Sequence, residues 1–278
     1  MKYGLVIPIG GPRQFADYAR QAEQAGWDGV FLGEAVWHND IWIMLAAAAM
    51  QTEHVRLGSM ISPLPRMRPW KLASETATLD HLSGGRVILS VGVGVLYYGY
   101  QSFLDEVTDI KVRAELLDEG IDILTLLYQG EPFTFQGKHY HIDLTKMDKQ
   151  YYPPRPVQQP RIPIWVVGVW QRMKSMRRAL RCDGLLLNKK DASGKDQAVT
   201  PADLRAAKSF IDANRTLTTP FDYIAEGVTV GMSPTQAVET IQPWADAGAT
   251  WWIEAPYGKS EDEILAHLRQ GPFKIPDA

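Results

Sequence analysis

Short apolar runs rich in valine, isoleucine and leucine recur along the whole chain and alternate with segments of helical periodicity. Most of these runs are apolar at both odd and even positions, which is the pattern of parallel strands that are covered on both faces. The runs predict eight strands, at Tyr3–Ile9, Gly29–Gly33, Val55–Ile61, Arg86–Val93, Ile162–Gly168, Gly184–Asn188, Tyr223–Val230 and Thr250–Glu254.

The segments between the runs carry the signals of helices. A stripe of apolar residues from Phe15 to Ala25 has helical spacing and stops at a glycine. Further helix starts are indicated by the Ser233-Pro234 pair and by a capping box at residues 260–263. Eight strands, each followed by a helix, in a chain of 278 residues predict a closed (β/α)8 TIM barrel. A doubly wound open sheet is the alternative, but the chain lacks its early phosphate-binding fingerprint.

The spacing of the strands breaks once, between Val93 and Ile162. A helix over Lys111–Gln129 fits into this interval, preceded by an aromatic loop at residues 95–110. The helix is followed at residues 131–143 by a hairpin whose turn is expected at Gln136-Gly137. No linker of domain-boundary length interrupts the chain. We therefore expect one barrel domain over residues 1–278, with a loop and a hairpin inserted after the fourth strand.

Composition narrows the class of protein further. With 45% hydrophobic and 22% charged residues the chain has an ordinary globular mix, and its net charge of −3 argues against nucleic-acid or membrane-surface partners. The longest apolar run, Ile41 to Met50, is half the length of a membrane span, and no signal peptide is visible. We therefore expect a cytoplasmic protein. The one cysteine, Cys182, excludes an internal disulfide and is expected to be a buried thiol.

The carboxyl ends of the predicted strands, where barrel enzymes place their chemistry, are rich in glycine and poor in catalytic groups. Glycine lets a flat or phosphorylated ligand approach the backbone closely. On position alone Glu34 and His38 are the best acid–base candidates, although both would also suit a solvated loop. No metal site is expected, because His139 and His141 in the hairpin lack a third ligand nearby in the sequence.

Two further features have ordinary structural explanations. Gly92-Val93-Gly94 is not a dinucleotide fingerprint, since a tyrosine stands where the third glycine is needed. Some tryptophans lie within predicted strands and are expected in the core, namely Trp165, Trp251 and Trp252. Others lie at or beyond strand ends, where lining a pocket is about as plausible as core packing: Trp37, Trp42, Trp70 and Trp170.

Several loose motifs become specific through their order and spacing. They are VRLGSM at 55–60, TLDHLSGGR at 78–86, DEG at 118–120 with GEPF at 130–133, and PRPVQ at 154–158 with IPIWV at 162–166. Together they resemble the bacterial luciferase-like flavin-dependent oxidoreductases and monooxygenases over nearly the whole chain. The resemblance implies a (β/α)8 barrel that uses reduced FMN or coenzyme F420. It also implies a small-molecule substrate, and it leaves open a separate flavin reductase and a homodimer as partners.

The resemblance further assigns roles to individual positions. It places the cofactor ring in the barrel mouth, supported by a bulge with a non-prolyl cis peptide that maps to Ser59-Met60. The cofactor phosphate maps to residues 168–172, after the fifth strand, where a helix start and a guanidinium suit an oxyanion. The cofactor-binding residues expected on this basis are Ser59, Met60, Ser62, Gly92, Gly94, Gly168, Val169, Trp170 and Arg172. The residues expected to line the substrate pocket are Trp37, Tyr97 and Tyr98.

One departure from the family bears on the reaction. Many relatives end the second strand with Trp-Asp-His, whereas this chain has Gly33-Glu34-Ala35 and so keeps the carboxylate but loses the imidazole. The aromatic loop over residues 96–103 suits a lid over a largely apolar substrate. We therefore expect first an FMNH2/O2-dependent monooxygenase with Glu34 and His38 as catalytic residues. The alternatives are an F420-dependent oxidoreductase that transfers hydride and a flavin-binding barrel without turnover.

Overall fold

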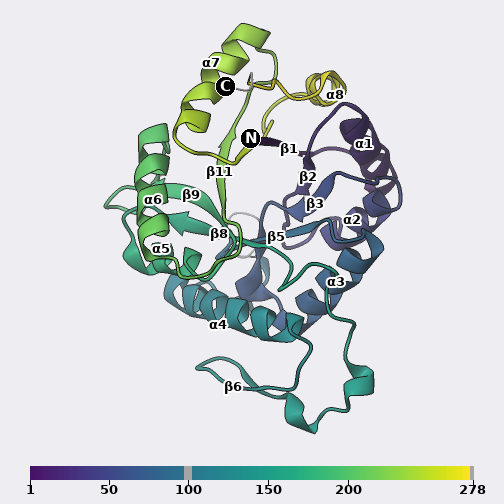
Figure 1. The fold of residues 1–278 in the computed structure, drawn as a ribbon, viewed down its shortest axis with the longest axis vertical. Helices are drawn as coiled ribbons and strands as arrows, with labels where there is room; N and C mark the ends of the chain where they lie inside the picture. The colour runs from purple at the N-terminus through teal and green to yellow at the C-terminus, as the bar shows by residue number, and fades with distance from the viewer. Residues whose placement is uncertain (97–101, 276–278) are drawn as a thin grey trace.

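The computed structural model describes residues 1–96 and 102–275 of the chain. Within these ranges, eight parallel strands form a closed barrel in which each strand pairs with the next and the last pairs with the first. Helices surround this ring of strands (Figure 1). The structure therefore confirms the (β/α)8 barrel and excludes the open sheet. In barrel order the strands are β1 (Lys2–Val6), β2 (Gly29–Leu32), β3 (Arg56–Ser59), β5 (Val87–Gly92), β8 (Ile164–Val169), β9 (Gly184–Lys190), β11 (Asp222–Gly227) and β12 (Trp251–Glu254).

Two helices of the outer ring begin at the serine caps that the sequence predicts. Ser233 and Ser260 are N-caps, and each forms a capping box with a residue of the first turn, Gln236 and Glu263 respectively. The helices are α1 (Pro12–Gln24), α2 (Ile41–Ala49), α3 (Pro69–Leu82), α4 (Ile110–Tyr128), α5 (Met173–Ala179), α6 (Pro201–Asn214), α7 (Pro234–Asp246) and α8 (Glu261–Gln270). Short 3-10 turns lie at Leu64–Arg66, Leu144–Lys146 and Lys149–Tyr151.

The interior of the barrel is filled by an aromatic layer. Phe31 stacks on Trp165 with ring centroids 5.6 Å apart, and Trp251 meets both rings edge-on. All three side chains are fully buried, so the barrel is a packed core rather than a pore. Trp252, the next residue along β12, points the other way and packs between strands and helices. Of the strand tryptophans, two therefore line the barrel and one packs under the helices, as expected.

The bulge at the end of the third strand is present, but one bond later than predicted. The cis peptide joins Met60 to Ile61 rather than Ser59 to Met60. After this break the chain pairs again as the short strand β4 (Ser62–Pro63), which lies beside the end of β5. A second short strand that the sequence did not predict, β10 (Asp196–Gln197), folds back antiparallel to β9.

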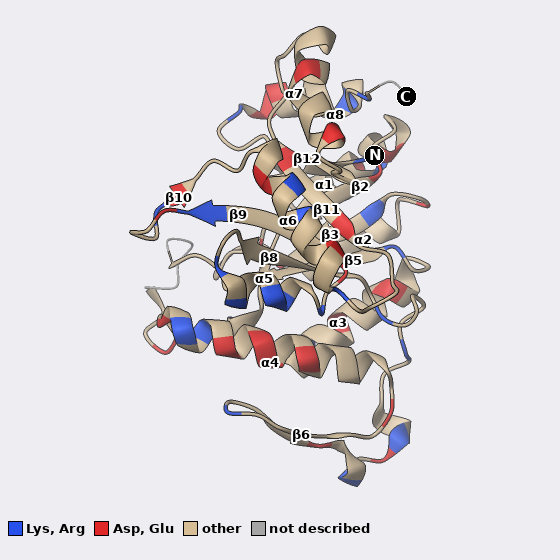
Figure 2. Cartoon of the chain, turned by 60° about the vertical axis from the view of Figure 1, so that its left-hand side comes forward, with Lys and Arg blue, Asp and Glu red and all other residues tan. Residues whose placement is uncertain are grey.

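The insertion after β5 forms an outer layer on α4. The hairpin of β6 (Thr134–Gln136) and β7 (His141–Asp143) lies on the side of α4 that faces away from the barrel (Figures 1 and 2). A small hydrophobic cluster that includes Leu116, Ile123 and Tyr140 joins the two. The turn differs from the prediction: Gln136 pairs with His141, so the loop comprises residues 137–140 rather than Gln136-Gly137.

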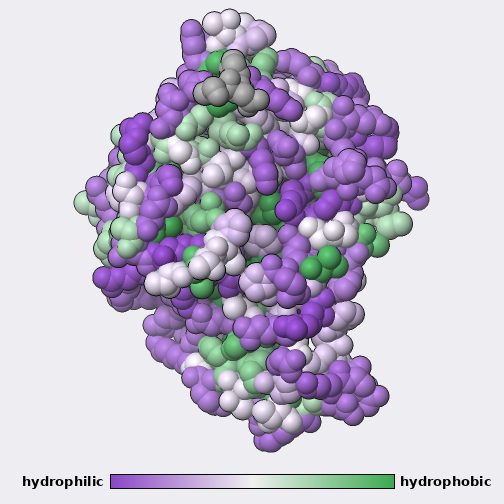
Figure 3. Space-filling view, in the orientation of Figure 1, coloured by the Kyte–Doolittle hydropathy of each residue, from purple (hydrophilic) through white to green (hydrophobic). Residues whose placement is uncertain are grey.

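The surface is mixed in charge and largely hydrophilic. Acidic and basic residues are interspersed along α4, and lysines mark the end of β9 (Figure 2). On the face drawn in Figure 3, hydrophobic residues reach the surface in scattered patches, one of which lies at the end of the molecule that carries the hairpin. None of the helices described is long and apolar enough to cross a membrane. Cys182 is a buried thiol, as expected, and burial raises its pKa to about 12.

Candidate active site

The carboxyl ends of the barrel strands form an open mouth above the aromatic layer. Side chains that face the barrel interior can be followed strand by strand, because they alternate with those that pack under the helices. On β2 the buried Phe31 is followed inward by Gly33, and on β11 the buried Ile224 is followed by Glu226. Gly33 and Glu226 are solvent-exposed although they face inward. Solvent therefore enters the mouth as far as this layer and is stopped by the aromatic side chains below.

Glu34 follows β2 at the edge of this mouth and is the acid–base group with the clearest geometry. Its Oε2 accepts a hydrogen bond of 2.7 Å from the Ser62 hydroxyl, which β4 presents after the cis peptide. Burial raises the pKa of Glu34 to about 7, and the Ser62 hydrogen bond and the positive charge of Arg66 oppose this rise. A carboxyl with such a pKa populates both protonation states at neutral pH and can therefore give or take a proton.

Arg66 ties two loops of the mouth together, a role that the sequence gave no reason to suspect. Its guanidinium donates to the Val36 carbonyl at 3.2 Å, on the loop that carries Glu34. It also forms an ion pair of 3.3 Å with Glu106, on the loop after β5, and both side chains are largely shielded from solvent. Arg66 therefore fixes the segment after β2 against the segment after β5.

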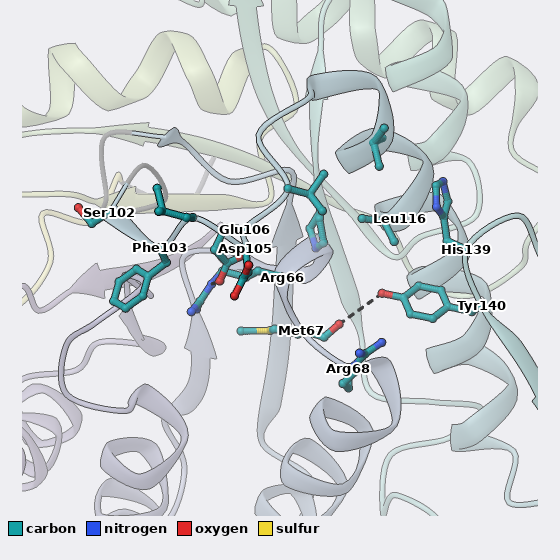
Figure 4. A pocket seen from close by; sticks show the side chains of 14 residues that line it. Arg66, Met67, Arg68, Ser102, Phe103, Asp105, Glu106, Leu116, His139 and Tyr140 are labelled. Atoms are coloured by element: carbon teal, nitrogen blue, oxygen red, sulfur yellow. Dashed lines mark hydrogen bonds and ion pairs between the residues drawn. The ribbon is translucent and has the colours of Figure 1, made fainter.

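A groove of about 720 Å³ lies beside the mouth, on the outer side of Arg66. It is enclosed by the residues after β4, by the loop at 102–107, by α4 and by the hairpin, and the Tyr140 hydroxyl donates across it to the Met67 carbonyl at 3.4 Å (Figure 4). None of Glu34, Ser62 and Gly92 lines it. The groove and the mouth are therefore different surfaces, and the Glu34 carboxyl belongs to the mouth.

The remaining candidates of the loop after β2 do not join Glu34. Trp37 is 86% exposed, and His38 is exposed on the same loop. Asp40, two residues later, caps α2 through hydrogen bonds to the Trp42 and Ile43 amides. Roles for Trp37 and His38 in the site remain predictions. Tyr97 and Tyr98, the other two residues expected to line the pocket, lie outside the described residues.

Three of the expected cofactor residues shape the ends of β3 and β5 through their backbone conformation and packing. Ser59 is buried, and its hydroxyl joins β3 to β5 by donating to the Ser90 carbonyl at 2.9 Å. A methyl group on Gly92 would come within 3.1 Å of both Ile61 and Val167, so glycine lets these two side chains pack against the end of β5. Gly94 has a φ of +73°, which favours glycine as well.

The loop after β8 is ordered by its own backbone. The amides of Val169 and Trp170 already donate to the Ser175 hydroxyl and to the Asn188 carbonyl, at 3.0 and 2.7 Å. These two amides are therefore not available to a phosphate, contrary to the simplest form of the prediction. The exposed Arg172 remains as a cation beside the β9–β10 turn, where its guanidinium lies 3.9 Å from the position of a methyl group built on Gly194.

The mouth fits a planar heterocyclic cofactor. Glycine occupies inward positions on β2 and β5, at Gly33 and Gly92, above a floor of packed aromatic rings. A methyl group at Gly33 would lie 3.4 Å from the Met60 carbonyl and 3.8 Å from the Tyr257 hydroxyl, so the backbone bulge and this tyrosine converge there. The aromatic floor, the glycines beside it and the carboxyl at the edge together suit a planar ring that exchanges protons with a substrate.

Sequence reasoning missed two residues of the mouth, Glu226 and Tyr257. Tyr257 follows β12 in an irregular loop and carried no motif. Glu226 lies inside a predicted strand, and its signal was available: it is two residues after Ile224 on the same face of the strand.

Other charged groups near the strand ends have structural roles. Glu254, fully buried at the end of β12, accepts hydrogen bonds from the Thr229 amide and hydroxyl, both at 2.6 Å, and from the Trp252 indole. His139 pairs with Glu115 at 2.8 Å in the hairpin turn. Over residues 1–96 and 102–275, no group of three or more His, Cys, Asp and Glu side chains could hold a metal ion.

A sequence model of a family described as luciferase-like monooxygenase matches residues 1–271. Among curated proteins, the chain is 31% identical over 164 residues to an F420-dependent glucose-6-phosphate dehydrogenase of Nakamurella multipartita. The matched region is 53% of this chain and 46% of that protein. The chain spans somewhat less than half the length of the first curated relatives that it matches.

Two solved structures share the fold over most of the chain. The coenzyme F420 dependent tetrahydromethanopterin reductase from Methanopyrus kandleri has a TM-score of 0.74 at 16% identity and covers 97% of this chain and 98% of its own. The second is the oxygenating constituent of 3,6-diketocamphane monooxygenase from Pseudomonas putida, in complex with FMN. It has a TM-score of 0.64 at 21% identity, and the match covers 87% of this chain and 71% of that one. At these identities the likeness shows the fold alone.

Proposed function

The chain belongs to the luciferase-like monooxygenase family, and from that premise we propose that it is an F420-dependent oxidoreductase in which Glu34 exchanges the proton that accompanies hydride transfer. The sequence alone favoured reduced FMN and oxygen, because the histidine of the strand-two motif is replaced by Ala35. The neutral-range pKa of Glu34 supports the other cofactor, since this carboxyl supplies an acid–base group without an imidazole.

The proposed role of Glu34 follows from its surroundings. A bound deazaflavin supplies a hydride acceptor or donor. In the ionised form, a Glu34 carboxylate oxygen accepts the proton of a substrate hydroxyl; in the neutral form, the same group returns a proton to a carbonyl oxygen. The Ser62 hydroxyl donates to Oε2 and so orients the carboxyl while it favours the ionised form. Burial favours the neutral form, and the balance keeps both states populated near pH 7.

The other proposed roles are binding and positioning. Met60, Ile61 and Gly92 would lie against the ring, and Gly33 would let it approach the backbone. Arg172 would attract the phosphate through its exposed guanidinium. Arg66 would hold the loop of Glu34 in place while the ring is bound.

The test is a pair of titrations with purified protein, one with F420 and one with FMN, followed by tryptophan fluorescence. We expect F420 to bind at least tenfold more tightly, and we expect Glu34→Gln to retain F420 binding. With F420 and a panel of small alcohols, the wild-type protein should reduce the deazaflavin, and Glu34→Gln should lower this rate by about 100-fold or more.

Two outcomes would overturn the proposal. Tighter binding of reduced FMN with oxygen uptake coupled to product would indicate a monooxygenase. An undiminished rate in Glu34→Gln would remove the carboxyl from the reaction.

A further inference from the structure

Glu226 is a carboxyl in the barrel mouth that the proposed reaction leaves unused. It stands near the end of β11, where Ile224 packs inside the barrel with Trp251. The register pairs Glu226 with Ile253 on β12, and Ile253 is also part of the interior cluster. Because side chains alternate along a strand, Glu226 points into the mouth, one layer above the aromatic floor.

The surroundings of this carboxyl offer it no protein partner. Among the described residues, no hydrogen bond or ion pair reaches Glu226, although solvent reaches its side chain. On its β12 side the inward residues are Ile253 and Ala255. On the β9 side, Leu186 faces inward, and Asn188, the next residue on that face, turns its amide oxygen to the Lys189 backbone at 2.6 Å. No cation compensates Glu226 from either neighbouring strand.

The two lysines at the end of β9 and the carboxyl at the end of β12 are engaged elsewhere. Lys189 pairs with Asp203 at 2.9 Å, and Lys190 pairs with Asp196 of β10. Glu254, on the outward face of β12, is saturated by Thr229 and Trp252. Although solvent reaches Glu226, the surrounding barrel wall partly desolvates its carboxyl and raises its pKa, and no charge or hydrogen bond of the described residues opposes this rise. A carboxyl in such a position costs folding stability, and a bound ligand that donates to it would recover that cost.

We propose that Glu226 binds a hydrogen-bond donor of the substrate, a hydroxyl or a protonated amine, on the wall of the mouth three strands away from Glu34. The substrate class is then a small organic alcohol or amine with an apolar remainder, because the other inward residues around Glu226 are hydrophobic. The assignment of the ligand as substrate rests on the proposed function. The contact itself depends only on the geometry of β11 and its neighbours, and it adds one polar group to the largely apolar substrate that the sequence predicts.

The test follows the Glu226 carboxyl directly by carbon-13 NMR of protein labelled at the glutamate carboxyl carbon. The resonance is identified by its loss in Glu226→Gln, and the probes are cyclohexylamine, cyclohexanol and methylcyclohexane, added without cofactor. We expect at least one donor probe to shift the Glu226 resonance while methylcyclohexane leaves it in place. Glu226→Gln should weaken binding of that probe by about tenfold or more. Glu239, exposed on α7, provides the control as Glu239→Gln.

The outcomes separate the two donor chemistries. A shift with cyclohexylamine alone assigns the site to amines, a shift with cyclohexanol alone assigns it to alcohols, and both support the proposal. If neither donor moves the Glu226 resonance more than methylcyclohexane does, the proposal is wrong. The same holds if Glu226→Gln binds the donors as well as the wild type. Because no cofactor is present, a failure of F420 to bind would not affect this result.

Discussion

The Glu34 carboxyl is balanced between burial, which favours its neutral form, and two contacts that favour its charge. The contacts come from Ser62, through a 2.7 Å hydrogen bond, and from the positive charge of Arg66. Ser62 and Arg66 both follow β3, whereas Glu34 follows β2. The protonation state of Glu34 therefore depends on groups that the neighbouring strand positions. Small changes in these partners should therefore move the pKa of Glu34 without altering the fold.

Ser62→Ala should raise the pKa of Glu34 above 7, because it removes a hydrogen bond that favours the ionised form. The midpoint is measured by carbon-13 NMR of the labelled carboxyl over pH 5 to 9. Ser59→Ala is the matched control, since the Ser59 hydroxyl bonds to Ser90 and not to Glu34. Equal midpoints in the wild type and in Ser62→Ala would show that the serine does not set this pKa.

Glu34→Gln should stabilise the protein at pH 8 and leave its stability near pH 4 unchanged. The folded state holds the Glu34 proton up to a pKa of about 7, against a usual value of 4.5, so the wild type loses stability as the pH rises through this window. Each pKa unit corresponds to about 1.4 kcal/mol. Since the group is partly exposed, we expect a gain of about 1–2 kcal/mol in urea unfolding. A gain of equal size at pH 4 would contradict this cause.

The loop between β11 and α7 is the element most dependent on one side chain. Glu254 accepts hydrogen bonds from the Thr229 amide and hydroxyl, and both residues are buried. Glu254→Ala should therefore lower the free energy of unfolding by about 2–4 kcal/mol. Chemical denaturation measures the loss, and Glu239→Ala on the exposed face of α7 should change it by less than about 0.5 kcal/mol. Similar values for both variants would refute the role of Glu254.

The backbone amides of the hairpin turn are capped by one carboxylate of α4. Glu119 accepts the amides of Lys138, His139 and Tyr140 at 2.7 to 3.1 Å, and so it fixes the turn. Glu119→Ala should speed hydrogen exchange in residues 137–143 by about tenfold or more while the barrel strands stay protected. Glu115→Ala removes only exposed ion pairs of the same turn and should have little effect. Equal acceleration in both variants would contradict the capping role.

Elements defined by local pattern were predicted well. The eight apolar runs match the eight barrel strands, and the serine caps of α7 and α8 stand where the sequence placed them. The hairpin turn was misplaced because Glu119, from a helix almost twenty residues earlier, selects a four-residue loop. The cis bond was expected one residue too early, since the resemblance fixes the bulge but not the peptide within it.

The chemistry of the mouth was harder to predict, because it arises only when the barrel closes. Glu34 was identified from its place after a strand, but its pKa depends on Ser62, 28 residues away. Glu226 was overlooked because its strand was interpreted as one apolar run, and its inward direction follows from the register with β12. Roles for His38 and Trp37 stay predictions, and both residues lie exposed on the loop after β2.

At the scale of the whole molecule, a closed barrel with an aromatic floor supports a mouth edged by carboxyls. The hairpin of β6 and β7 lies on the side of α4 that faces away from the barrel, and the groove of about 720 Å³ is a separate surface that Glu34 does not line. The mouth and the groove are the two surfaces at which a cofactor ring is to be sought. Only the mouth brings it to the Glu34 carboxyl.

A crystal structure of the protein grown with F420 tests this account most directly. The account predicts that the deazaflavin ring lies in the mouth against the Met60–Ile61 peptide, with the Glu34 carboxyl at the edge of the ring. A ring bound in the groove lined by Arg66 and Tyr140, or crystals in which F420 leaves the mouth empty, would contradict it.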